Sequence, residues 1–248
     1  MMDLYLQDWR AWTPHRDAPS EPRLDSSVKP SGAGVPAMLR RRLNLIGRAI
    51  CDMLVTLDPE SNSLLLHASR HGDGDRTLEM LYTLNEGDPL SPARFGLSVH
   101  NAIIGVHSIA SGNRRSQQAI AASGGEWAAL LMESRGYLAD GEREIIVVFG
   151  DQPVPARFAD YVPSTQSAAV ALRLSAHPTP GVRRIVEHPG AGAPEPVQPL
   201  DVIDWLLQDE ALLACPIARR QWQLEGESSL QASNACKTGA RRAESGHN

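Results

Sequence analysis

Apolar residues follow helical and strand periods in alternation along residues 36–175, after a short apolar segment near the N-terminus. Apolar positions recur every three or four residues in four segments, which predicts helices at Pro36–Leu54, Asp75–Asn85, Ser98–Ala110 and Glu126–Tyr137. Short apolar runs bounded by turn residues predict strands at 3–7, Ser63–Ala68, Ala119–Ser123, Arg143–Phe149 and Ser167–Leu174. Strands that alternate with helices of this length indicate an α/β fold with a mixed or parallel sheet flanked by helices.

Proline and glycine divide the rest of the chain. Residues 13–36 read as a surface loop, and residues 176–200 contain six prolines with several glycines, which is typical of a linker. A last helix is predicted over Leu200–Cys215. We therefore expect a domain at 1–175, a linker at 176–200, a helical segment at 201–225 and a disordered polar tail at 226–248.

Composition narrows the function classes. The 248 residues carry 24 basic and 29 acidic side chains, a formal net charge of −5 that argues against a nucleic-acid-binding domain. No apolar run reaches membrane-spanning length, and the first residues lack the pattern of a secretory signal. The three cysteines are widely spaced and form no CxxC motif, which disfavours a disulfide framework or a cysteine-based zinc site. We expect a cytoplasmic protein without cofactor or metal.

The segment Ser91–Gly112 contains the most apolar helix of the chain. Ser98 is placed to cap this helix and Gly112 to end it in a left-handed conformation. A helix that is apolar nearly all round lies in an interior or an interface, where Gly105 would let another backbone approach closely. His100 and Asn101 most simply satisfy backbone groups near the cap. The alternative, His100 as an acid or base, lacks a nucleophile nearby in sequence.

A strand, a tight turn and a helix follow over Ser116–Glu133. In many α/β enzymes a nucleophile occupies such a turn, where the helix N-terminus stabilises an oxyanion. The GxSxG pattern fails because Ala121 stands at the first glycine position. Ser123 is therefore a weak nucleophile candidate, and the alternative is that it caps the helix.

Polar residues also follow the strand Ser63–Ala68, with His67, Ser69, Arg70 and His71 preceding a glycine-rich turn. Their spacing matches no metal motif and no phosphate-binding glycine motif. We interpret this segment as a turn whose aspartate caps the next helix.

The block Phe95–Ala102, followed by Gly105, Ile109 and Gly112, resembles the N-terminal region of ketoacyl synthases. It is most similar to the short ketoacyl-synthase-like proteins of aryl polyene and xanthomonadin pigment clusters. Leu39–Leu43, Ala68–Gly72 and Pro89–Pro92 carry the same resemblance. The likeness extends over about residues 36–175 and implies half of a thiolase-type layered αβα fold.

One departure from the family decides the expected function. In active ketosynthases the elbow after the small strand carries the acyl-accepting cysteine, whereas here Ser123, Gly124 or Gly125 falls there. The remaining chain leaves no room for the second half that supplies the catalytic histidines. The resemblance therefore implies a non-catalytic, chain-length-factor-like partner of a β-ketoacyl-ACP synthase, which shapes the acyl pocket across a heterodimer interface.

Residues expected to border the partner or the acyl tunnel are Phe95, Ser98, His100, Asn101, Gly105, Ser123, Gly124 and Gly125. The alternative function is a Ser123-dependent acyltransferase or thioesterase with His100 as base. A third hypothesis is a scaffold whose Arg40–Arg42 run contacts the acidic acyl carrier protein, although a solvated helix face would look the same.

Overall fold

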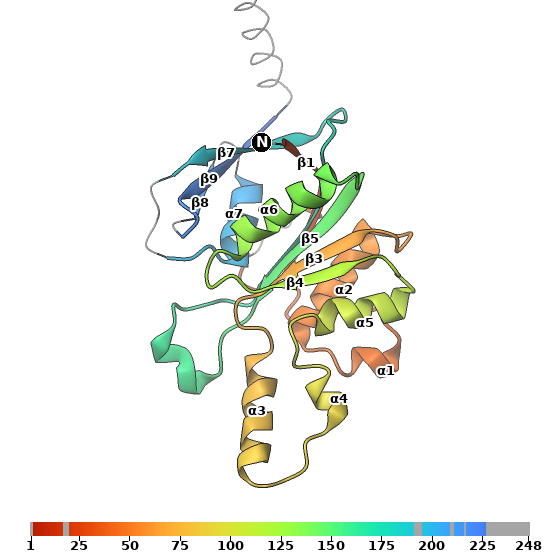
Figure 1. Cartoon of the computed structure of the whole chain (residues 1–248), viewed down its shortest axis with the longest axis vertical. Helices are drawn as coiled ribbons and strands as arrows, with labels where there is room; N and C mark the ends of the chain where they lie inside the picture. The colour runs from red at the N-terminus through yellow and green to blue at the C-terminus, as the bar shows by residue number, and fades with distance from the viewer. Residues whose placement is uncertain (1, 17–19, 191–194, 209–210, 216, 227–248) are drawn as a thin grey trace, which may run out of the picture.

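The computed structural model describes residues 2–16, 20–190, 195–208, 211–215 and 217–226. Within these residues one nine-stranded mixed sheet runs in the order β4-β3-β5-β6-β1-β7-β9-β8, and β2 pairs with β1 (Figure 1). The strands are β1 (Leu4–Trp12), β2 (Leu24–Asp25), β3 (Leu64–Ala68), β4 (Gln117–Ile120), β5 (Glu144–Asp151), β6 (Ala168–Ser175), β7 (Arg183–Pro189), β8 (Leu212–Cys215) and β9 (Arg220–Glu225). The predicted α/β fold is confirmed.

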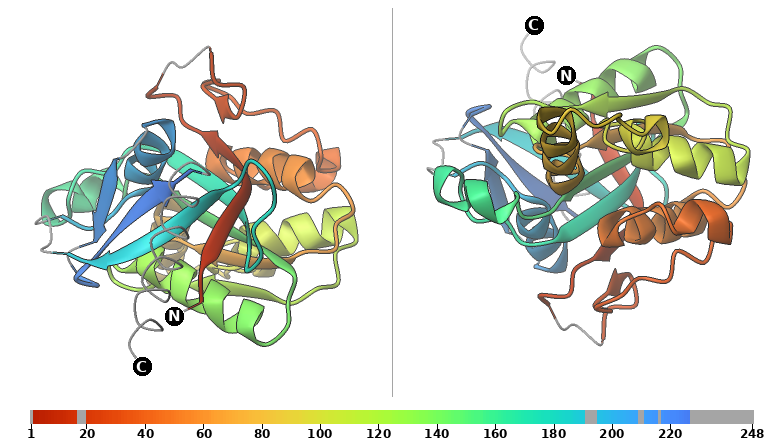
Figure 2. Two further views of the ribbon diagram at one scale, coloured as in Figure 1. Left: turned by 90° about the horizontal axis from the view of Figure 1, so that it is seen from above. Right: turned by 90° about the horizontal axis from the view of Figure 1, so that it is seen from below.

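The helices are α1 (Ala37–Arg40), α2 (Leu45–Leu57), α3 (Gly74–Asn85), α4 (Pro92–Phe95), α5 (Ala102–Ser111), α6 (Glu126–Ala139) and α7 (Pro199–Leu207), with a 3-10 helix at Ala156–Tyr161. Helices α2 and α5 cover one face of the sheet and α6 and α7 the other (Figure 2), whereas α3 and α4 project away from it. Side chains alternate across β3: Leu64 and Leu66 pack with α6 and α7, whereas Leu65 packs with α2. Strand β3 is therefore buried on both faces, and it pairs in parallel with both β4 and β5.

Two predicted helices begin or divide differently from expectation. The segment Pro36–Leu54 forms two helices because Asn44 interrupts it and caps α2, accepting the Gly47 N–H at 2.9 Å. Helix α5 begins at Ala102, so Ser98 does not cap it; the Ser98 hydroxyl donates instead to the Phe95 carbonyl. Gly112 ends α5 with φ 77°, as predicted.

The C-terminal region departs most from expectation. The predicted linker 176–200 contains β7, which pairs with β1. The predicted helix Leu200–Cys215 is wrong beyond Leu207, because the chain then forms β8 and β9. Trp205 and Trp222 pack edge-on against Trp127 of α6, with ring centroids 5.9 and 6.4 Å away. The region after residue 175 thus shares the core of the preceding one. The predicted tail lies almost wholly outside the described residues.

Candidate functional site at the elbow and the open sheet edge

The elbow consists of residues 121–125, between the end of β4 and the start of α6. It lies at the carboxyl ends of the parallel strands β3, β4 and β5, where open α/β sheets usually bind ligands. Ser123 is exposed and has φ 50°, a left-handed conformation that is unusual for serine. The prediction that Ser123 caps α6 is wrong: Gly125 occupies the N-cap position, and no side chain caps it.

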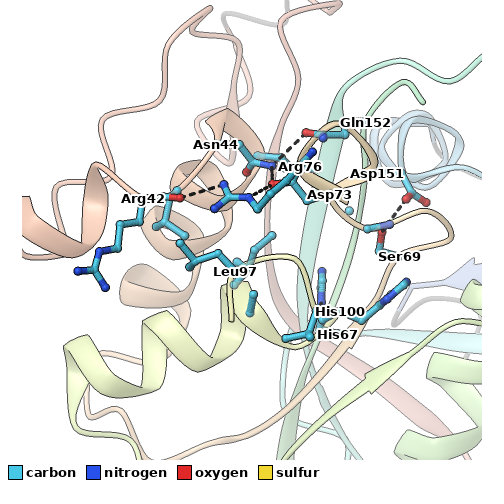
Figure 3. A pocket seen from close by; sticks show the side chains of 17 residues that line it. Arg42, Asn44, His67, Ser69, Asp73, Arg76, Leu97, His100, Asp151 and Gln152 are labelled. Atoms are coloured by element: carbon cyan, nitrogen blue, oxygen red, sulfur yellow. Dashed lines mark hydrogen bonds and ion pairs between the residues drawn. The ribbon is translucent and has the colours of Figure 1, made fainter. Parts of the chain in front are cut away.

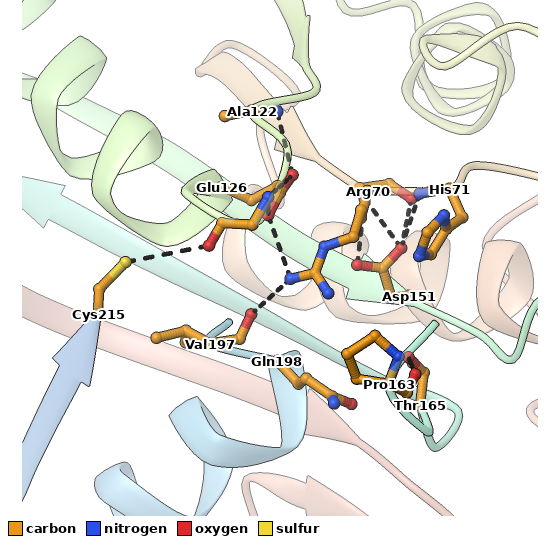
Figure 4. A network of polar contacts seen from close by, with 12 residues as sticks. Arg70, His71, Ala122, Glu126, Asp151, Pro163, Thr165, Val197, Gln198 and Cys215 are labelled. Carbon is orange, nitrogen blue, oxygen red and sulfur yellow. Dashed lines mark hydrogen bonds and ion pairs between the residues drawn. The ribbon is translucent and has the colours of Figure 1, made fainter. Parts of the chain in front are cut away.

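The Glu126 carboxylate accepts hydrogen bonds from backbone N–H groups of the elbow (Figure 4). Glu126 is the first residue of α6 and is fully buried. Its carboxylate accepts the N–H of Ala122 at 3.0 Å and the N–H of Gly124 at 3.0 Å from both oxygens. A helix N-terminus favours negative charge, and here the chain supplies that charge itself. The amides that could stabilise an oxyanion are already used.

Arg70 connects this carboxylate to two other parts of the fold. Its guanidinium lies 3.5 Å from Glu126 and donates to the Val197 carbonyl at 3.3 Å. Its backbone N–H donates to Asp151 at the end of β5, which also accepts the Ser69 hydroxyl at 2.7 Å. Burial raises the pKa of Asp151, an effect that these hydrogen bonds oppose. The carboxyl ends of β3 and β5, the elbow and the segment before α7 thus form one polar network.

The chain covers part of its own elbow. A side-chain carbon on Gly124 would lie 2.4 Å from Ile217 Cδ1 and 3.0 Å from Pro196 Cβ. Both Gly124 and Gly125 are buried. The buried Cys215 thiol lies beside them and donates to the Gly124 carbonyl at 4.0 Å, a proximity that sequence spacing could not reveal. No space for an acyl chain remains directly over Gly124.

His67 and His100 border a small cavity on the other side of the sheet edge (Figure 3). His67 is buried, its Nδ1 lies 3.2 Å from the His100 carbonyl oxygen, and burial lowers its pKa to about 4. The cavity measures about 30 Å³, enough for a water molecule or two and too small for a substrate. Within the described residues, no hydrogen bond joins His100 to Ser123, so the structure does not assemble a Ser123–His100 pair.

The edge of the sheet at β4 is open. Within the described residues β4 pairs with β3 alone, and α5 and α6 flank it on opposite faces. Ser108 of α5 donates to the Gln117 side chain at 3.4 Å, and Tyr137 of α6 donates to Gln118 at 3.1 Å. Ile109 is 75% exposed and Met132 is 69% exposed on these two helices. An open strand between exposed apolar side chains is typical of a protein interface.

The exposed side of α5 extends this surface. A side-chain carbon on Gly105 would meet no atom within 4 Å, so no backbone of this chain approaches it. Asn101 is also exposed, and Phe95 is 58% exposed at the approach to the helix. We name β4, the exposed side of α5 and Met132 of α6 the edge surface.

Two absences apply to the described part of the chain. It contains no cluster of three His, Cys, Asp or Glu side chains placed to hold a metal ion. None of its helices has the length and apolar character needed to cross a membrane.

The β4-β3-β5-β6-β1 sheet, its two helical layers and its elbow define one half of a layered αβα domain of the thiolase type. The chain belongs to the family of the β-ketoacyl synthase N-terminal domain, whose model matches residues 9–225. This match is longer than the expected 36–175 and includes β7, β8 and β9. No curated protein matched the chain.

Solved structures with this fold include ketosynthase complexes. A complex of the ketosynthase ApeO with its chain length factor ApeC from Xenorhabdus doucetiae matches with TM-score 0.73 and 21% identity, over 91% of this chain and 100% of that chain. The ishigamide ketosynthase/chain length factor matches with TM-score 0.54 and 12% identity, over 75% and 67%. A chain of the AntDE:AntF complex, a type II PKS acyl-carrier protein with its ketosynthase, matches with TM-score 0.54 and 12% identity, over 79% of this chain and 70% of that chain. At these identities the likeness establishes the fold.

Proposed function

We propose that this protein is a non-catalytic, chain-length-factor-like subunit that pairs with a β-ketoacyl synthase. The observation that carries the proposal is the Glu126 carboxylate on the elbow amides of Ala122 and Gly124. Decarboxylative condensation needs a thiolate nucleophile and free donors for the developing oxyanion. The elbow has serine at its turn, and its amides already bind a carboxylate, so neither requirement is met.

The edge surface supports pairing with a second chain. Ser116 and Ile120 direct their carbonyls inward, accepting the N–H groups of Leu65 and Ser69. Because strand groups alternate, Gln117 and Ala119 direct their N–H and C=O groups toward the open edge. A ketosynthase strand could add to this edge while its helices cover Ile109 and Met132. Pairing there would leave α5 and its open Gly105 against the partner, where the subunit helps to shape the acyl pocket.

The pathway is the finer part of the proposal. The block Phe95–Ala102 resembles short proteins of aryl polyene and xanthomonadin clusters, and the chain matches the full length of a chain in the ApeO–ApeC complex. Both points favour a polyene or related fatty-acid-like product.

The test is co-expression with each ketosynthase of the source organism, followed by purification through a tag on this chain. We expect one ketosynthase to co-purify in equal amount. Ala119→Pro removes an outward N–H and should abolish the complex, whereas the matched variant Ala119→Val retains the N–H and should preserve it. A protein that binds none of these ketosynthases would contradict the proposal.

The same complex separates the proposal from a Ser123-dependent acyltransferase or thioesterase. We expect Ser123→Ala to leave both thioester hydrolysis and polyene synthesis unchanged. Loss of thioester turnover in Ser123→Ala would instead favour the enzyme.

An acyl carrier protein is the second partner that we propose. Arg41 and Arg42 are exposed, and within the described residues neither they nor Arg40 form an ion pair. Exposed positive charge without an ion-pair partner attracts an acidic partner. The double variant Arg41→Glu/Arg42→Glu should weaken carrier binding in a salt-dependent manner and leave ketosynthase binding unchanged.

A further inference from the structure

An arm of residues 74–96 projects from the body beyond the carboxyl edge of the sheet (Figure 1). It contains α3, α4 and the segment that joins them. Neither helix buries any residue. Leu81, Leu84 and Phe95 are each more than half exposed, and Tyr82 and Leu90 are also among the exposed large side chains.

Three leucines form a ridge on α3. The half-buried Leu78 and the exposed Leu81 and Leu84 recur every three residues, so they follow one row along the helix surface. A helix of 12 residues gains most of its stability by packing its apolar face, which α3 does not do within this chain. Apolar surface gathered in this way marks an interaction site.

The arm is held in place at its root. Asp73 caps α3, and the Arg76 guanidinium bonds to Asp73 and to the Arg42 carbonyl, at 3.0 and 3.1 Å. Arg157 of the 3-10 helix donates to the Tyr82 hydroxyl at 2.8 Å. An ion pair between Arg94 and Glu79 joins α4 to α3. The polar contacts fix the arm and leave the leucine ridge free, an arrangement that is already ordered for binding.

We propose that the arm docks on the ketosynthase subunit that pairs with the edge surface. This inference rests on the proposed function and identifies a second, larger contact with the same partner. The arm leads directly into α5: Phe95 and the exposed Val99 and Asn101 connect the leucine ridge to the open face at Gly105.

The size of a stable interface supports one partner for both surfaces. Such an interface buries about 800 Å² on each side and involves some 20–30 residues. The edge surface offers a four-residue strand and a few side chains of two helices, too little for a stable heterodimer. The arm supplies further exposed apolar side chains next to the edge surface, among them Leu81, Leu84 and Phe95.

The charged side chains of the arm indicate what kind of partner surface it binds. Its two arginines are engaged with Asp73 and Glu79, whereas Asp75, Glu86 and Asp88 are exposed and form no ion pair within the described residues. The arm therefore presents an apolar ridge with an acidic border. The partner surface is an apolar groove with basic residues along its rim.

The test measures the affinity of the co-purifying ketosynthase for variants of the full chain. Leu81→Ser/Leu84→Ser should weaken binding at least tenfold, and Glu86→Arg/Asp88→Arg should slow association and reduce its salt dependence. Val28→Ser/Leu212→Ser is the matched control, since these residues are 76% and 55% exposed elsewhere on the fold. Thermal unfolding of the free variants should match that of wild type, because the ridge is unburied.

Photo-crosslinking gives a second readout. A benzophenone amino acid at Leu84 or Phe95 should join this chain to the ketosynthase, and the same group at Val28 should not. Wild-type binding by the Leu81→Ser/Leu84→Ser variant would overturn the arm proposal alone, as would crosslinks from Leu84 to a second copy of this chain. If the wild-type chain binds no ketosynthase, the proposed function fails first and the arm proposal with it.

Discussion

Gly124 donates its backbone N–H to both carboxylate oxygens of Glu126, at 3.0 Å each. The same carboxylate accepts from Ala122 and lies beside Arg70. The Ala122 and Gly124 amides of the elbow are thereby engaged within the chain, and Glu126 joins the elbow to Arg70. The stability of the elbow should depend on the acidic side chain more than on Ser123.

Replacement of Glu126 tests these contacts. Glu126→Ala leaves the buried Gly124 N–H and the half-buried Ala122 N–H without their acceptor and removes the ion-pair partner of Arg70, so we expect the free energy of unfolding to fall by about 3 kcal/mol. Glu126→Gln keeps one acceptor oxygen and should cost about half as much. Urea denaturation of both variants measures the difference. Equal stability of wild type and Glu126→Ala would show that the contact contributes little.

Gly105 separates the stability of the free protein from partner binding. It lies inside α5 with no atom near an added side-chain carbon. Gly105→Ala should therefore stabilise the free chain by about 0.5–1 kcal/mol, because alanine favours a helix. The same methyl group should weaken ketosynthase binding if a partner backbone approaches α5 closely. Thermal unfolding and affinity, measured on one variant, should move in opposite directions.

The C-terminal strands should unfold together with the rest of the sheet. Trp222 of β9 is buried against Trp127 of α6. Trp222→Ala removes this packing, and we expect a loss of about 3–5 kcal/mol. Fluorescence and circular dichroism should report one coincident transition on urea unfolding. Two separated transitions would indicate that residues 176–226 fold independently.

His67 should make the protein less stable in acid. Burial lowers its folded pKa from 6.5 to about 4, so between these values the unfolded chain binds a proton that the folded protein does not. The free energy of unfolding is therefore unaffected by the titration of His67 above pH 6.5. It falls as the pH drops from 6.5 toward 4, with a slope of at most about 1.4 kcal/mol per pH unit. Burial also lowers the pKa of His107, so this residue makes the protein less stable in acid in the same way.

The variant His67→Asn isolates that contribution. Its free energy of unfolding should fall less steeply than that of wild type between pH 6.5 and pH 4, as measured by urea denaturation at several pH values. Parallel slopes for the two proteins would contradict a neutral, buried His67.

Local patterning was sufficient for most of the first 175 residues. The apolar run at β3 and the glycine that ends α5 are visible because each depends on residues close in sequence. The division of Pro36–Leu54 was missed because helical periodicity continues through Asn44, whose capping role depends on the turn that precedes it. The absence of a cysteine at the elbow is likewise a fact of the sequence.

Tertiary structure decided the rest, because the decisive contacts join distant residues. Strand β7 pairs with β1 across about 180 positions, so its proline- and glycine-rich surroundings resembled a linker. The alternation Gln221–Leu224 is a local signal for β9, but the segment forms a strand by pairing with both β7 and β8. Glu126 follows the turn in sequence, yet only the folded elbow turns the Ala122 and Gly124 amides toward it and brings Arg70 beside it. Sequence determined the α/β layers and the absence of a cysteine at the elbow, whereas long-range packing covered the elbow and left β4 and the arm exposed.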